Sequence, residues 1–125
     1  MAPFGLNHVS VVMLGVRDLN RAVSFYRDVL NLALKTQFPG FAFFDGGGVT
    51  LALSEPLAKA KPQGAGATEI VFSVPDVMPA YQALLAKGVK FAREPRIVAG
   101  SDWAANFDDP DGHTLSILGP NRGSS

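Results

Sequence analysis

An internal repeat constrains this chain more than any other feature. The apolar run 11–19 recurs 58 residues later as 69–77, and both runs close on an Asp that is followed by apolar residues at three- and four-residue steps. A second pair of segments, 45–53 and 109–117, matches at a spacing of 64 and has the turn residues of a hairpin. Two matching registers predict a duplicated unit.

Each half predicts a strand, a helix and then strands. We therefore expect an α+β fold of two tandem βαβββ modules that form a cup-shaped mixed sheet with the helices on its outer face. The expected domain is 1–125, with module one at about 6–55, a Pro- and Gly-containing linker at 56–67 and module two at about 68–120.

Local signals place the ends of the two expected helices. Asp18 and Asp76 lie where an N-cap carboxylate would accept from the first-turn amides. Asn31 and Gly88 lie where a helix ends on a left-handed residue. The helices are expected to follow Asp18 and Asp76 directly.

Composition narrows the classes of function. The 125 residues include 11 Lys plus Arg and 11 Asp plus Glu, and this balance argues against nucleic-acid binding. The absence of cysteine excludes disulfides and thiolate metal sites. No apolar run reaches the ~18 residues of a membrane helix, and the first residues lack the pattern of a signal peptide. We expect a soluble, cytoplasmic protein with no membrane partner.

Two strings resemble a known family. The segment 18–30, DLNRAVSFYRDVL, resembles the capped helix of the vicinal-oxygen-chelate superfamily, and 107–113, FDDPDGH, resembles its hairpin. That superfamily includes glyoxalase I, extradiol dioxygenases and bleomycin-resistance proteins. The resemblance covers about residues 6–120 and implies a cup that is often completed by a homodimer.

The resemblance also implies four metal-ligand places, which fall on Val11, Ala52, Glu69 and Ser116 in this sequence. Only Glu69 is an ordinary ligand, and a divalent cation typically needs three protein ligands or more. We expect no metal and no other cofactor. His8 leaves an alternative open, because a bulge between His8 and Asp18 would turn its side chain toward the cup opposite Glu69.

The remaining candidates each have two interpretations. Glu69, among apolar neighbours, is either an edge carboxylate or a buried acceptor or general base for a ligand. Trp103, expected on a mobile loop, and Phe43 and Phe107 are either core residues or ligand contacts. His113 is either a solvated turn residue or a catalytic base.

The predicted function is binding of a small organic molecule in an aromatic-lined cup, probed by six candidate ligand-binding residues: Glu69, Trp103, Phe43, Phe107, Ser116 and His8. The alternative is an enzyme of the lyase, isomerase or dioxygenase type that uses Glu69 with or without a metal. Whether the chain is an enzyme stays open at this point, and the fold alone does not name the ligand.

Overall fold

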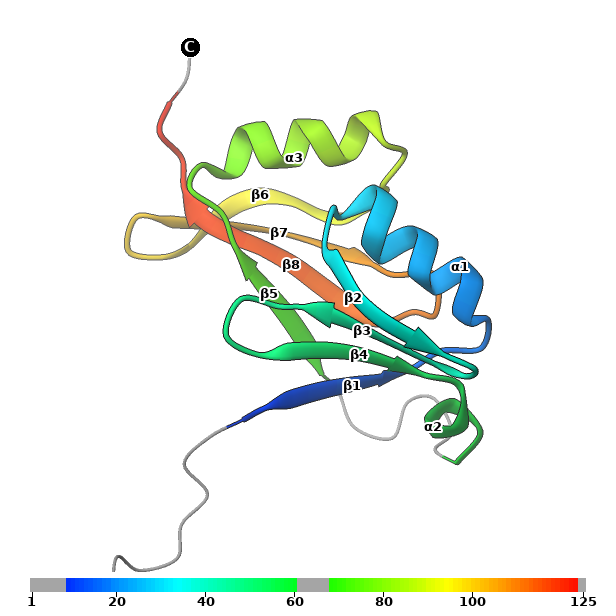
Figure 1. Cartoon of the computed structure of the whole chain (residues 1–125). Coiled ribbons are helices and arrows are strands. Elements are labelled where there is room, and N and C mark those ends of the chain that lie inside the picture. Colours follow the sequence, from blue (N-terminus) through cyan, green and yellow to red (C-terminus); the bar gives the residue numbers. More distant parts are fainter. Residues whose placement is uncertain (1–8, 61–67, 124–125) are drawn as a thin grey trace, which may run out of the picture. The chain divides into compact units, whose positions relative to one another are not determined.

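A computed structural model describes residues 9–60 and 68–123 (Figure 1). Residues 1–63 and 64–125 form two units, and each is described by itself. His8 and the predicted linker residues 61–67 lie outside the described residues. In chain order the elements are β1 (Val11–Gly15), α1 (Leu19–Ser24), a π-helical turn (Phe25–Val29), β2 (Ala33–Phe38), β3 (Phe41–Asp45), β4 (Thr50–Ser54), α2 (Glu55–Ala60), β5 (Glu69–Ser73), α3 (Val77–Ala86), β6 (Phe91–Ala99), β7 (Asp102–Asp108) and β8 (Thr114–Pro120).

The first unit is a four-stranded sheet with the order β1-β4-β3-β2. β1 runs parallel to β4, and the other pairs are antiparallel. Helix α1 lies over one face of this sheet (Figure 1). The buried ring of Tyr26 contacts that of Phe44 on β3 with 6.0 Å between the ring centroids. Because side chains alternate along a strand, Phe44 identifies the helix face, and Phe41 and Phe43 lie on the open face.

Two carboxylates stabilise the start of α1. Asp18 accepts a hydrogen bond from the backbone nitrogen of Arg21 at 3.2 Å, as the N-cap prediction requires. Glu55, 36 residues further on, accepts from the backbone nitrogen of Leu19 at 2.8 Å. The helical segment ends at Asn31, whose φ of 62° confirms the predicted left-handed residue.

Helix α2 corrects the prediction that 56–67 is a linker without regular structure. The hydroxyl of Ser54 accepts from the backbone nitrogen of Leu57 at 3.0 Å, so a side chain caps the first turn. Pro56 lies in that turn, where its missing N–H costs nothing. The Pro was interpreted as a helix breaker, but at this position it favours a helix.

The second unit repeats the arrangement with the order β5-β8-β7-β6 and a parallel β5–β8 pair. Helix α3 covers one face, where the Tyr81 ring lies 4.7 Å from that of Phe91, and Phe91 lies 5.2 Å from Phe107. Gly88 has the predicted positive φ, at 90°. Asp76 does not cap α3 with its side chain; its carboxylate accepts from the backbone nitrogen of Arg122, which the chain brings there after β8.

The order of elements confirms the α+β class and the two βαβββ modules, each with a helix on one face of its sheet. The two hairpins differ, however. Four residues (46–49) join β3 to β4, whereas five (109–113) join β7 to β8. Among the described residues, no helix is long and apolar enough to cross a membrane.

Candidate functional site

The open face of the second sheet carries a carboxylate held by a carboxamide. Asn106 on β7 donates from Nδ2 to Oε2 of Glu69 on β5 at 2.9 Å. The bond passes over β8, which lies between the two strands. Phe107, the neighbour of Asn106, contacts the helix-side ring of Phe91, so Asn106 and Glu69 lie on the face without a helix.

Ser116 belongs to the same face. It pairs with Val71 on β5 and with Asn106 on β7, and it is 2% exposed. Its short side chain leaves room for the Glu69 carboxylate to reach across β8. Glu69 and Ser116, two of the predicted site residues, are thus neighbours of Asn106, a residue that the sequence interpretation missed.

Phe107 corrects an expectation. It was matched with Phe43 at the 64-residue spacing and expected to line the same space as Glu69. The structure pairs Phe43 with Ala52, and it pairs Asn106 with Ser116 at the equivalent place of the second unit. The extra hairpin residue shifts β7 by one, and a one-residue shift moves a side chain to the other face. Phe107 is fully buried against Phe91 on the face that carries α3.

Trp103 corrects a second expectation. It lies in β7 and not in a mobile loop, and it pairs with Gly119 on β8 and with Ile97 on β6. The β7–β8 register is continuous, so Trp103 shares the helix-side face with Phe107. Neither aromatic ring lies on the same face as Glu69.

Phe43, Val11 and Ala52 belong to the open face of the first sheet. Met13, two residues after Val11, pairs with Ala52, and Ala52 pairs with Phe43. The half-buried Phe43 ring stacks on Phe41 with 6.4 Å between the centroids. This face is apolar at the places where the second sheet carries Glu69 and Asn106.

The described residues do not fit a bound metal ion. Val11 and Ala52, at two of the implied ligand places, have no donor atom, and Oε2 of Glu69 already accepts from Asn106. Within residues 9–60 and 68–123, no group of three or more His, Cys, Asp or Glu side chains could hold a metal ion. His8 lies outside these ranges, so its predicted alternatives stay predictions.

His113 is paired with a buried carboxylate and is not a solvated turn residue. Its Nδ1 lies 2.7 Å from Oδ2 of Asp109, whose side chain is 0% exposed. Oδ1 of Asp109 accepts from the backbone nitrogens of Asp111 and His113. The hydrogen bond to Asp109 raises the pKa of His113, partial burial opposes it, and the nearby negative charges add to the rise. The arrangement ties the β7–β8 hairpin together.

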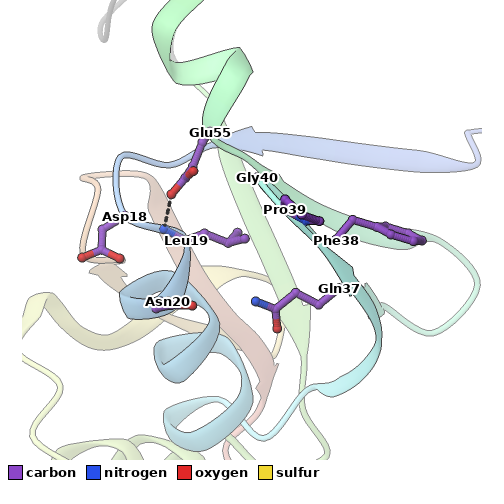
Figure 2. Close-up of a pocket in the computed structure, with 8 residues that line it drawn as sticks. All are labelled: Asp18, Leu19, Asn20, Gln37, Phe38, Pro39, Gly40 and Glu55. Atoms are coloured by element: carbon purple, nitrogen blue, oxygen red, sulfur yellow. Dashed lines mark hydrogen bonds between the residues drawn. The ribbon is translucent and has the colours of Figure 1, made fainter.

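A hollow of about 470 Å³ in the first unit lies beside the start of α1 (Figure 2). Its lining consists of Asp18, Leu19, Asn20, Gln37, Phe38, Pro39, Gly40 and Glu55. Figure 2 shows the Glu55 carboxylate directed at the backbone nitrogen of Leu19. Both carboxylates of the hollow therefore serve the start of α1, and none of the five predicted site residues in the described ranges lines it.

The sequence profile of the Glyoxalase/Bleomycin resistance protein/Dioxygenase superfamily matches residues 5–117. The chain belongs to this superfamily. The resemblance seen in the two strings 18–30 and 107–113 is thereby confirmed, and both strings lie within the matched range.

Known members of the superfamily match over most of the chain. The chain is 31% identical to "Glutathione transferase FosA" of Serratia marcescens over 116 residues, which cover 90% of this chain and 78% of FosA. TnmS3, an antibiotic-binding protein from Streptomyces sp. CB03234, matches at 22% identity and a TM-score of 0.79, covering 95% of this chain and 100% of TnmS3. A superfamily member from Nocardioides matches at 24% identity and a TM-score of 0.78, covering 98% and 89%. The last two similarities show the fold.

Proposed function

We propose that this superfamily member binds a small organic molecule on the open face of the second sheet, without a metal ion. In this proposal Glu69 accepts a hydrogen bond from an amine or hydroxyl group of the ligand, and Ser116 lies beside it. Phe43 remains a proposed ligand contact from the first unit. Trp103 and Phe107 are left out because they lie on the helix side.

The observation that carries the proposal is the half-engaged carboxylate of Glu69. Oε2 accepts from Asn106, whereas no side chain or backbone amide of the described residues donates to Oε1. A carboxylate fixed at one oxygen is oriented to accept a ligand donor at the other. The antibiotic-binding TnmS3 and the name of the superfamily support antibiotics as the first ligand class to test.

Calorimetric titration tests the proposal. We expect bleomycin, or another member of a panel of antibiotics with amine or hydroxyl groups, to bind the wild-type chain. Glu69→Gln keeps the size and removes the charge, and it should weaken binding by about 1.5–3 kcal/mol, or roughly 10- to 100-fold in Kd. Glu94→Gln on the exposed part of β6 makes the same chemical change and should have no effect. The absence of binding across the panel contradicts the proposal.

The metal-free part of the proposal has its own test. Protein purified without a chelator should contain well under one equivalent of Zn, Ni, Mn or Fe. Dialysis against EDTA should change neither the melting temperature nor the Kd of the ligand. A stoichiometric metal whose removal lowers both would contradict this part and bring His8 into the site.

An enzyme is the second candidate, and the similarity to FosA favours it, because that relative is named a transferase. In this alternative Glu69 acts as a general base on the bound molecule, in a reaction of the transferase, lyase, isomerase or dioxygenase type. Mass spectrometry of the ligand after incubation distinguishes the two candidates. A product formed by the wild type but not by Glu69→Gln supports the enzyme, and an unchanged ligand supports binding alone.

A further inference from the structure

The amide of Asn106 is held in an orientation that leaves its oxygen unpaired. Nδ2 donates to Glu69, and Oδ1 is buried with no hydrogen-bond partner among the described residues. Rotating the amide by 180° would set its oxygen against the carboxylate of Glu69, and two acceptors cannot bond to each other. Glu69 therefore fixes the amide, and the buried oxygen remains without a donor.

An unpaired buried acceptor lowers the stability of a folded protein, because water no longer solvates it. Native structures contain few such groups, and each one calls for an explanation. For Asn106 the fold itself gives none. At the equivalent place of the first unit stands Phe43, which pairs with Ala52 as Asn106 pairs with Ser116. This type of sheet accepts an apolar side chain at that place.

The two units also differ at the partner of Asn106. β1 pairs Val11 with Thr50 in the register in which β5 pairs Glu69 with Thr114. Val11 and Phe43 in one sheet thus correspond to Glu69 and Asn106 in the other. The polar pair occurs in the second unit alone, and its amide carries an unpaired oxygen that the apolar pair avoids.

We infer that Asn106 is a positioning residue for ligand binding, retained at the expense of stability. Its Nδ2 fixes Oε2 of Glu69, so that Oε1 is directed at the donor group of the ligand. This inference rests on the proposed function, in which Glu69 accepts from the ligand. It adds that the affinity depends on a residue that need not touch the ligand.

The test compares the stability and the ligand affinity of one variant, Asn106→Leu. Leucine removes both the unpaired oxygen and the support of Glu69. We expect its melting temperature to rise by roughly 3 °C or more, while its Kd for the antibiotic that binds the wild type rises about tenfold or more. Gln82→Leu, the same exchange on the exposed side of α3, should leave the Kd unchanged.

A double-variant cycle separates positioning from a direct or purely structural role. If Asn106 acts through Glu69, then Asn106→Leu should cost little further affinity when Glu69 is already glutamine. Additive losses, an unchanged Kd in Asn106→Leu, or a loss of affinity accompanied by a lower melting temperature would each overturn the inference. No binding by the wild type, in contrast, would overturn the proposed function on which it rests.

Discussion

Replacing Phe107 and Phe43 by alanine, each in turn, tests the register of β7. The two residues are equivalent at the 64-residue spacing of the sequence, but the structure places Phe107 on the helix face and Phe43 on the open face. Phe107 is 0% exposed and lies between its strand neighbours and the ring of Phe91. The two alanine variants should therefore lose different amounts of stability.

The structure gives the size of the difference. Truncating a fully buried Phe removes its transfer free energy and leaves a cavity, at a cost of about 3–5 kcal/mol in the free energy of unfolding. Phe43 is half-buried on a face without a helix, so its truncation should cost about 1–2 kcal/mol. We expect Phe107→Ala to be the less stable variant by about 2–3 kcal/mol.

Urea unfolding followed by circular dichroism measures both losses on the same scale. Phe107→Leu, which should cost about 1–2 kcal/mol, provides a folded variant if Phe107→Ala does not fold. Equal losses at the two positions, or a larger loss for Phe43→Ala, would refute the one-residue shift of β7 and return Phe107 to the open face.

Three further predictions concern other parts of the chain. Because the pKa of His113 is raised in the folded state, its stabilisation is fully present below the unfolded value of about 6.5 and is lost as the pH rises through the folded value; His113→Gln should therefore lower the melting temperature more at pH 6 than at pH 9, and a pH-independent difference would contradict this. Glu55→Ala removes the acceptor for the Leu19 amide and should cost about 1 kcal/mol in urea unfolding, about as much as the loss of an N-cap; no loss would show that water replaces it. The predicted homodimer, burying on the order of 1,600 Å², should give twice the mass of 13.2 kDa in light scattering at micromolar concentration, and a monomer mass would refute it.

The sequence was sufficient where the signals are local. The cap at Asp18 and the left-handed residues Asn31 and Gly88 depend on side chains and backbone within one turn, and the structure confirms all three. The order of elements followed from the repeat, because each half carries its own strand and helix pattern. Asp76 failed because its carboxylate binds the amide of Arg122, 46 residues away.

The candidate site was predicted only in part. Glu69 and Ser116 lie on one face because the β5–β8 register follows the 58- and 64-residue spacings. Which face each residue of β7 occupies depends on the length of the preceding and following turns, and one extra residue in 109–113 exchanges the faces. Asn106 was therefore overlooked, although a polar residue between Ala105 and Phe107 in an apolar strand is a signal that a corrected register would have used.

Backbone amide NMR during titration of the bound antibiotic tests the central claim, ligand binding at the Glu69 face, most directly. The account predicts that the largest shift changes in the second unit occur at Glu69, Asn106 and Ser116, with small changes at Trp103 and Phe107, and that Glu69→Gln abolishes this pattern at the same ligand concentration. Shift changes centred on Trp103 and Phe107, or on the hollow beside α1, with Glu69 unaffected, would contradict it.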